Sequence, residues 1–462
     1  MNLAGVKARV LLWLLGGYLL LSYSFMQLRI PPSSFGIPLG ELFLVFALLT
    51  TNVPLVFSRM AVVVSLVPFL TWWCFGIGRL MVDSINRGFW SFRDGTQVLE
   101  SLYLIVGFAA AANSGIIEKL MRHLPIVLAV LCIYGLGFPF QDYIAALSPK
   151  LAGAQGQPIP VFGYTTTPSI MLWTAFYCLV AEREGPPRVS RAVIACFLIG
   201  FAVLLVQSRT TYLQIFGLAA VVLIFRPQAL GKMTLAIPAV LLALGLLAAF
   251  QIRVPGALTS EVSVSFLADH FASIFGIGSE SGESGVSAAA RGVDLRLHWW
   301  INLYDRLTDD AVDLLTGLGY GIPLTDFSDT LGVTTREPHN SYISVVARLG
   351  VLGFAVWFWM QVALFAASVR AYWQCRRLRW ESGEDFLLMV IAFAVLLLIA
   401  AFGEDSMEKP YDAIPYYALF GFALRIAFAF RTRDDGKSER PRPYRSLADA
   451  SRPHVRRGTA IP

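Results

Sequence analysis

The segment Arg-Glu-Pro-His-Asn-Ser-Tyr at residues 336–342 places a histidine, His339, where a polar stretch meets an apolar run. The ordinary pKa of a histidine is about 6.5, so an imidazole can take a proton near neutral pH. His339 therefore has the chemistry of a general base. A single histidine at such a boundary is also common as a hydrogen-bonded structural residue. Asn340 and Glu337 beside it suit either orienting the ring or capping the following helix.

Several arginines have the chemistry of anion binding. Arg209 lies in a short turn, Gln-Ser-Arg-Thr-Thr-Tyr, between two apolar runs, where placing a cation costs roughly 2.5–3.5 kcal/mol. Arg291, Arg296 and Arg336 add cations later in the chain. The planar guanidinium bonds oxygens in pairs and so suits a diphosphate. The alternative for Arg209 is a side chain that extends to the lipid headgroups.

A third cluster consists of the carboxylates Glu404, Asp405 and Glu408 in Phe-Gly-Glu-Asp-Ser-Met-Glu-Lys-Pro. Three carboxylates can hold a divalent cation. They also suit an ordinary acidic surface loop, and no further ligand motif accompanies them. We therefore expect neither a metal nor a cofactor.

The elements that position these residues are membrane helices. The 462-residue chain is 56% hydrophobic and only 15% charged, well below the charged share of about a quarter in soluble domains. Apolar runs long enough to cross a bilayer as helices recur along it. The sequence predicts an all-α, polytopic membrane helical bundle of about twelve spans. They are expected near residues 10–26, 38–57, 60–82, 96–112, 124–140, 165–181, 190–207, 211–225, 233–250, 340–366, 386–402 and 411–430.

The distribution of Lys and Arg predicts the orientation and the domains. Lys7, Arg9 and the basic loops around residues 182–191, 226–232 and 370–379 fall on one side, which the positive-inside rule makes cytoplasmic. Both termini are then cytoplasmic, and the first apolar run lacks a cleavage site, so it is expected to stay as an anchor. We expect four parts: spans 1 to 9 in residues 1–250, one large periplasmic loop in 251–338, spans 10 to 12 in 339–430, and a basic cytoplasmic tail in 431–462.

The large loop contains three recognisable pieces. A Gly- and Ser-rich stretch at residues 276–292 is typical of a mobile lid or a surface linker. Residues 293–307 place Leu297, Trp300, Ile301, Tyr304 and Leu307 at helical spacing, which predicts an amphipathic helix at the membrane interface. The glycines of Leu-Leu-Thr-Gly-Leu-Gly-Tyr-Gly-Ile at 314–322 lack the context of a nucleotide site and indicate a tight turn.

Neither the net charge nor the cysteines indicate a nucleic-acid partner, a disulfide framework or a metal site. The net charge of +6 comes largely from the tail, where nine Lys/Arg face four Asp/Glu from Arg431 onward. Such a tail suits anionic lipid, so we expect no nucleic acid. The five cysteines show no disulfide or metal framework.

Three segments together resemble a known family. His-Asn-Ser-Tyr-Ile-Ser-Val-Val-Ala-Arg-Leu-Gly-Val-Leu-Gly at 339–353 resembles the His-Asn, Tyr and Leu-Gly-x-x-Gly signature of the O-antigen ligase and O-antigen polymerase family. The run from Gln207 through Arg209 is similar to that family's Ser-Arg entry to a span, and 296–322 resembles its Arg-to-Trp helix followed by a Gly-x-Gly turn. The resemblance covers about residues 190–425.

The resemblance implies a glycosyltransferase of the bacterial inner membrane with its active site facing the periplasm. The donor would be a glycan on undecaprenyl pyrophosphate, and the acceptor a glycan or lipid A-core. His339 would activate the acceptor hydroxyl, while Arg209 and Arg296 would bind the pyrophosphate, with Arg291 as the alternative loop arginine. Asn340, Tyr342 and Arg336 complete the expected substrate-binding set. The lipid bilayer and a chain-length regulator are the other expected partners.

The alternatives differ in class. Among transferases, a polymerase of O-antigen, capsule or exopolysaccharide is favoured, with an O-antigen ligase as the alternative. A twelve-span secondary transporter would line its path with charged residues, but its charges are expected at the midplane and its long connection in the middle of the chain. A membrane scaffold is the third possibility.

Overall fold

The computed structural model describes residues 3–31, 36–112, 115–135, 137, 140–152, 158–163, 168–180, 188–206, 209–231, 238, 249, 284–325 and 336–434. The described residues are overwhelmingly helical, as the composition predicts. The helices of the first half are α1 (Leu3–Met26), α2 (Leu39–Leu49), α3 (Val53–Ala61), α4 (Val67–Arg87), α5 (Phe89–Asp94), α6 (Thr96–Ser101), α7 (Tyr103–Ala110), α8 (Ile116–Gly135), α9 (Gln141–Leu147), α10 (Pro168–Val180), α11 (Arg188–Val206) and α12 (Arg209–Phe225). Those of the second half are the 3-10 turn η2 (Pro227–Ala229), α16 (Ser284–Thr308), α17 (Ala311–Thr316), α18 (Ser341–Arg377), α19 (Glu381–Gly403), the 3-10 turn η4 (Ser406–Glu408) and α20 (Pro410–Asp434).

Two short antiparallel hairpins interrupt the helices. Strand β1 (Arg29–Ile30) pairs with β2 (Ile37–Pro38), with Arg29 opposite Pro38. Strand β3 (Lys150–Ala152) pairs with β4 (Pro158–Pro160), with Leu151 opposite Ile159. Both hairpins are too short to form a layer of their own.

Four helices are long and apolar enough to cross a membrane within the described ranges. They are Gly5–Met26, Ser341–Arg377, Glu381–Gly403 and Pro410–Arg431. A fifth span results if α2 and α3, which meet at an angle of 84°, are counted together. The chain is therefore an integral membrane protein. Most of the predicted spans coincide with helices, but several of these are short, and the predicted span at 233–250 lies almost wholly outside the described residues.

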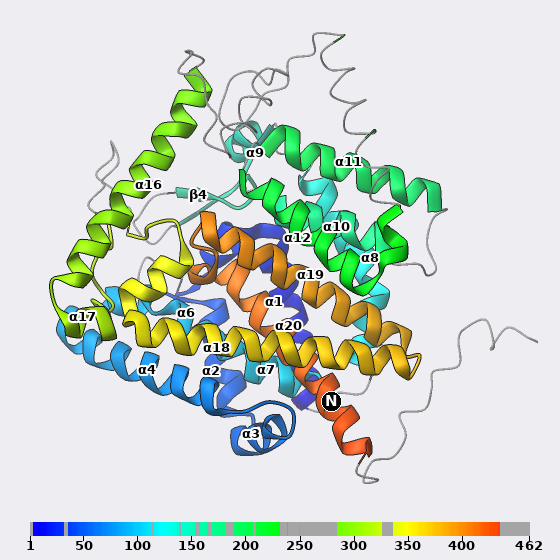
Figure 1. Cartoon of the computed structure of the whole chain (residues 1–462), viewed down its shortest axis with the longest axis horizontal. Helices are drawn as coiled ribbons and strands as arrows, with labels where there is room; N and C mark the ends of the chain where they lie inside the picture. Colours follow the sequence, from blue (N-terminus) through cyan, green and yellow to red (C-terminus); the bar gives the residue numbers. More distant parts are fainter. Residues whose placement is uncertain are drawn as a thin grey trace, which may run out of the picture.

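The last three long helices form the centre of the molecule. Helices α19 and α20 are the most deeply buried of the candidate spans, and α18 packs against both (Figure 1). Aromatic side chains fill the space between them. Trp357 and Tyr417 are fully buried, and the Tyr416 hydroxyl donates a 2.7 Å hydrogen bond to Oε1 of Gln361. These contacts hold α18 beside its neighbours along its length.

Helix α16 stands at the beginning of α18 (Figure 1) and confirms the helix predicted at residues 293–307. Of the predicted apolar positions, Leu307 packs inward beside Trp299 and Leu303, whereas Leu297, Ile301 and Tyr304 are half or more exposed. The helix begins at Ser284, so residues 284–292 are helical and not a linker. Residues 276–283, the rest of the predicted lid or linker, lie outside the described residues, as do tail residues 435–462.

Candidate active site

The turn after α17 meets a kink in α18, and this crossing fixes the segment that leads to His339. Gly317 has φ +78° and Gly350 has φ +69°, a left-handed region that glycine adopts without steric cost. A Cβ on either glycine would collide with the backbone of the other segment. The backbone amide of Leu318 donates to the Ala347 carbonyl at 2.8 Å, and that of Gly319 to the Arg348 carbonyl at 3.1 Å. The glycine-rich motif is thus the tight turn that the sequence predicts.

Charged side chains of α4 bind the backbone of the same turn. The backbone amide of Tyr320 donates to Oδ2 of Asp83 at 2.8 Å. Arg87 donates to the carbonyl oxygens of Leu318 at 2.9 Å and Tyr320 at 2.7 Å. The turn and α4 therefore form one polar contact, and the first half of the chain supports the segment before His339.

His339 occupies a strained position immediately before α18. Its φ is +52°, which is uncommon for a residue other than glycine and costs on the order of 1–2 kcal/mol. Helix α16 holds the preceding residue, since the Trp300 indole N–H donates to the Pro338 carbonyl at 3.0 Å. The Trp299 ring lies 6.0 Å from the imidazole, centroid to centroid. The contacts with α16 therefore hold the backbone of His339 in an unusual conformation and fix the position of its ring. Such strained residues are typical of functional sites.

Asn340 and Tyr342 act on the backbone. Oδ1 of Asn340 accepts hydrogen bonds from the amides of Tyr342 at 3.0 Å and Ile343 at 3.1 Å, which caps α18. Its Nδ2 donates to the Phe402 carbonyl at 3.0 Å. The Tyr342 hydroxyl donates to the Leu398 carbonyl at 2.7 Å. These contacts join the start of α18 to the end of α19, so the geometry favours positioning roles for two residues that the sequence places in the substrate-binding set.

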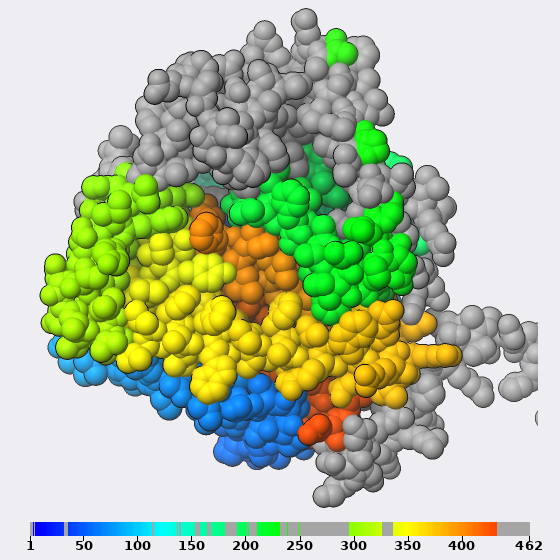
Figure 2. All heavy atoms as spheres, in the orientation of Figure 1, coloured from blue at the N-terminus to red at the C-terminus, as the bar shows by residue number. Residues whose placement is uncertain are grey.

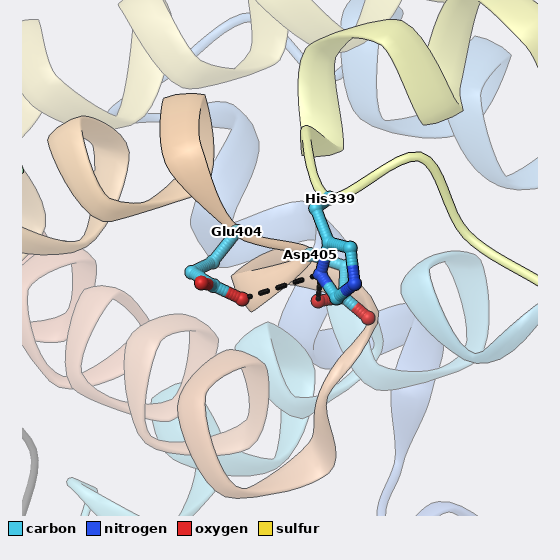
Figure 3. Close-up of side chains that lie close together, drawn as sticks. All are labelled: His339, Glu404 and Asp405. Carbon is cyan, nitrogen blue, oxygen red and sulfur yellow. Dashed lines mark ion pairs between the residues drawn. The ribbon is translucent and has the colours of Figure 1, made fainter. Parts of the chain in front are cut away.

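Because α18 and α19 are antiparallel neighbours, His339 meets the acidic residues that follow α19. Its Nδ1 lies 3.4 Å from Oε2 of Glu404 and 3.5 Å from Oδ1 of Asp405 (Figure 3). Lys409 completes the group: its Nζ lies 2.8 Å from Oδ1 of Asp405 and 3.4 Å from Oε2 of Glu404. The sequence predicted these carboxylates as either a metal site or an acidic loop. In the structure two of them, Glu404 and Asp405, lie beside His339.

The charges of this group shift the titration of its members. The Asp405 and Glu404 carboxylates raise the pKa of His339 to about 9, although burial acts in the opposite direction. Burial acts to raise the pKa of both carboxyls, but Lys409 and His339 outweigh it and hold the pKa of each below its usual value. At neutral pH the resting site therefore contains an imidazolium, an ammonium and two carboxylates.

Glu408 differs from its two neighbours. Its Oε2 accepts a 2.5 Å hydrogen bond from the Ser341 hydroxyl at the start of α18. Burial and the nearby Glu337 carboxyl raise the pKa of Glu408 to about 8. Glu408 is therefore mainly protonated at pH 7. Its hydrogen bond with Ser341 links η4 to α18.

Of the predicted arginines, Arg296 reaches the group around His339. Its Nη2 lies 3.6 Å from Oε1 of Glu404, and Figure 2 shows α16 directly beside the start of α18. Arg291 lies earlier on the same helix, and its side chain is outside the described part. Arg209 is the first residue of α12. Its side chain is likewise outside the description, but the next residue, Thr210, packs against Gly403, which adjoins Glu404.

Arg336 is engaged elsewhere. Its Nε and Nη2 donate to the two carboxylate oxygens of Asp94 at 3.1 and 2.7 Å, and its guanidinium lies 4.6 Å from the Trp90 ring centroid. The side chain is only 9% exposed. This geometry gives Arg336 a structural contact with α5.

Arg348, Asp94 and Lys409 are residues that the sequence analysis missed. Arg348 is 3% exposed and its Nη2 lies 2.8 Å from Glu337 and 3.2 Å from Asp94. An arginine about two turns into an apolar helix was a signal for a buried ion pair. Lys409 follows Asp405 by four residues, a spacing that favours pairing in a helical turn.

The ligand atoms of His339, Glu404 and Asp405 all lie within 4.8 Å of one another, so these three could approach one cation. Lys409 already supplies a positive charge at both carboxylates. A divalent ion would have to displace that ammonium, so the donor set fits a metal poorly.

Comparison with known proteins supports the motifs quoted above. Residues 194–358 match the family model described as O-Antigen ligase. The matched segment contains Arg209, Arg291, Arg296, Arg336, His339, Asn340 and Tyr342. Curated proteins yield no match to the chain. Over that segment the chain is similar to the O-antigen ligase family.

Proposed function

We propose that the protein transfers a glycan from undecaprenyl pyrophosphate to an acceptor sugar hydroxyl at the periplasmic face, polymerising repeat units of O-antigen, capsule or exopolysaccharide. One observation carries this proposal. His339 is one-third exposed and lies beside two carboxylates and Arg296, which places a proton acceptor next to a cation within the family-matched segment.

The reaction requires a proton acceptor and charge compensation. The acceptor oxygen bonds to the anomeric carbon, the bond from that carbon to the pyrophosphate oxygen breaks, and undecaprenyl pyrophosphate leaves with the electron pair. The acceptor proton passes to His339. Since the two carboxylates approach Nδ1, Nε2 is the nitrogen available to the acceptor, in the manner of a histidine oriented by a carboxylate.

The arginines would compensate the charge that develops on the diphosphate. Arg296 is the best-supported candidate, because its guanidinium is already in the group. Arg209, the first residue of α12, and Arg291 on α16 are the other proposed ligands. Paired hydrogen bonds from planar guanidinium groups suit the diphosphate oxygens.

The ion pairs of His339 with Glu404 and Asp405 also support a second role for its ring, stabilisation of the leaving group. With its pKa raised to about 9, the resting ring is an imidazolium, which can stabilise the negative leaving group. The two roles predict opposite pH dependences of the transfer rate.

For the arrangement in the membrane we propose the orientation that the basic loops predict. Both termini would be cytoplasmic, residues 251–338 would form the periplasmic loop, and the exposed Leu297, Ile301 and Tyr304 of α16 would lie at the outer interface. A chain-length regulator would be a further partner. The Lys409 contacts support a reaction that needs no metal.

The direct test is the surface-glycan profile of cells lacking the gene, resolved on a gel beside complementation with wild type and His339→Ala. We expect loss of long chains, single repeats still attached to their anchor, and no rescue by the variant. His298→Ala, an exposed histidine on α16, is the matched control and should rescue.

Other profiles would change the assignment. Full-length chains retained on undecaprenyl pyrophosphate and absent from lipid A-core would indicate a ligase. Solute uptake by membranes containing the protein, unaffected by Arg209→Ala and His339→Ala, would favour a transporter.

A further inference from the structure

Glu404 lies where three cations converge. Its Oε1 is 3.6 Å from Arg296, and its Oε2 is 3.4 Å from both His339 and Lys409. The three cations come from α16, the segment before α18, and the segment after α19. An anion at this point is attracted by all three, so the Glu404 carboxylate occupies the position that the charges of the group favour for an anionic ligand.

Glu404 is held much less firmly than Asp405. All the ion-pair distances of Glu404 are 3.4 Å or longer, and its side chain is 46% exposed. Asp405 is only 16% exposed and its Oδ1 is 2.8 Å from Lys409. Exposed, long ion pairs contribute little to stability. Glu404 can therefore leave its place at little cost, whereas Asp405 cannot.

The position of Glu404 at the end of α19 also weakens its hold on the site. Glu404 is the C-cap residue of this 23-residue helix, and the negative end of a helix dipole disfavours an anion. The carboxylate is therefore retained by the neighbouring cations and not by its own helix. A ligand with more negative charge would compete for those cations successfully.

We infer that Glu404 is a displaceable counter-ion that holds the diphosphate position of the resting site and leaves it when donor binds. This inference rests on the proposed function, because it identifies the anion as the diphosphate of the donor. Asp405 stays behind with His339 and Lys409. Glu404 thus sets the affinity for donor and for the product diphosphate.

The test is binding of inorganic pyrophosphate to the purified protein in nanodiscs, measured by calorimetry at fixed ionic strength. Glu404→Gln should tighten binding roughly tenfold, since one competing negative charge is removed from a partly screened site. Glu381→Gln removes the same charge at the other end of α19 and should leave the affinity unchanged. Arg296→Gln should weaken binding.

Equal or weaker pyrophosphate binding by Glu404→Gln would overturn the inference and make Glu404 a fixed partner of His339. If that variant does not fold, Glu404→Asp, with a carboxylate one methylene shorter, should still bind more tightly than wild type, and unchanged binding would refute the inference. Neither titration uses glycosyl transfer. Failure of His339→Ala to alter the surface glycan would refute the proposed function separately.

Discussion

Nη2 of Arg348 lies 2.8 Å from the Glu337 carboxylate, two residues before His339. The same atom is 3.2 Å from Asp94 on α5. The buried guanidinium of Arg348 on α18 thus contacts both the segment that leads to His339 and α5 in the first half of the chain.

Replacing Arg348 with methionine should destabilise the protein by about 3–5 kcal/mol, because two buried carboxylates lose their shared cation. The measurement is a denaturant or thermal titration of the purified protein. Arg370→Met on the exposed face of the same helix is the control and should change stability little. Equal effects of the two substitutions would show that the buried network does not stabilise the fold.

Gly350→Ala should reduce both stability and transfer. The new Cβ would meet the backbone at Leu315, and a left-handed alanine costs roughly 1–2 kcal/mol even without a collision. Gly78→Ala is the control for replacing a glycine within a helix, since a Cβ there meets nothing within 4 Å. Melting temperature and transfer rate should fall for Gly350→Ala alone. Wild-type behaviour would mean that the crossing of the turn with α18 can relax.

The pH dependence of kcat/KM distinguishes the two roles of His339. Its pKa is raised to about 9, so the neutral base becomes about tenfold more abundant with each pH unit up to that value. We expect kcat/KM to rise between pH 6 and 9 and then level off, and His339→Asn to abolish the rise. A rate that falls as pH passes about 9 would instead indicate that the imidazolium stabilises the leaving group.

The same shift affects stability. Because the folded pKa of His339 lies above the unfolded value, the stabilisation is complete below about pH 6.5 and is lost as pH rises through about 9. Wild type should therefore lose more stability than His339→Asn across this window, measured by denaturant titration at each pH. Parallel curves would mean that the ion pairs around His339 contribute nothing to folding.

Transfer by membranes treated with EDTA should remain at the untreated level, because Lys409 supplies the positive charge beside Glu404 and Asp405. The measurement is the rate of glycan transfer before and after chelation. Loss of activity that magnesium restores would instead assign His339, Glu404 and Asp405 as metal ligands.

The sequence predicted most of the described helices, because apolar runs report helices directly, and His339 lies just before one of them. That this region is the active site stays a prediction. The short connection between α18 and α19 predicts that these helices are antiparallel, but the contact of His339 with Glu404 and Asp405 depends on how their ends pack, which local sequence does not specify. Arg336 shows the main difficulty. It has the chemistry of a diphosphate ligand, but its partner Asp94 is 242 residues away in the chain. Which arginine is neutralised by such a partner is decided only by tertiary structure.

The pairing of Asp94 with Arg336 also has a consequence for biosynthesis. The ribosome makes Asp94 242 residues before Arg336, an interval of roughly 12 to 50 s at about 5–20 residues per second. Throughout that time the nascent chain carries the Asp94 carboxylate without the two arginines that neutralise it in the folded protein. The early helices can therefore be inserted in order, but the polar contact between α5 and the site forms only after Arg336 and Arg348, within the last third of the protein, have been translated.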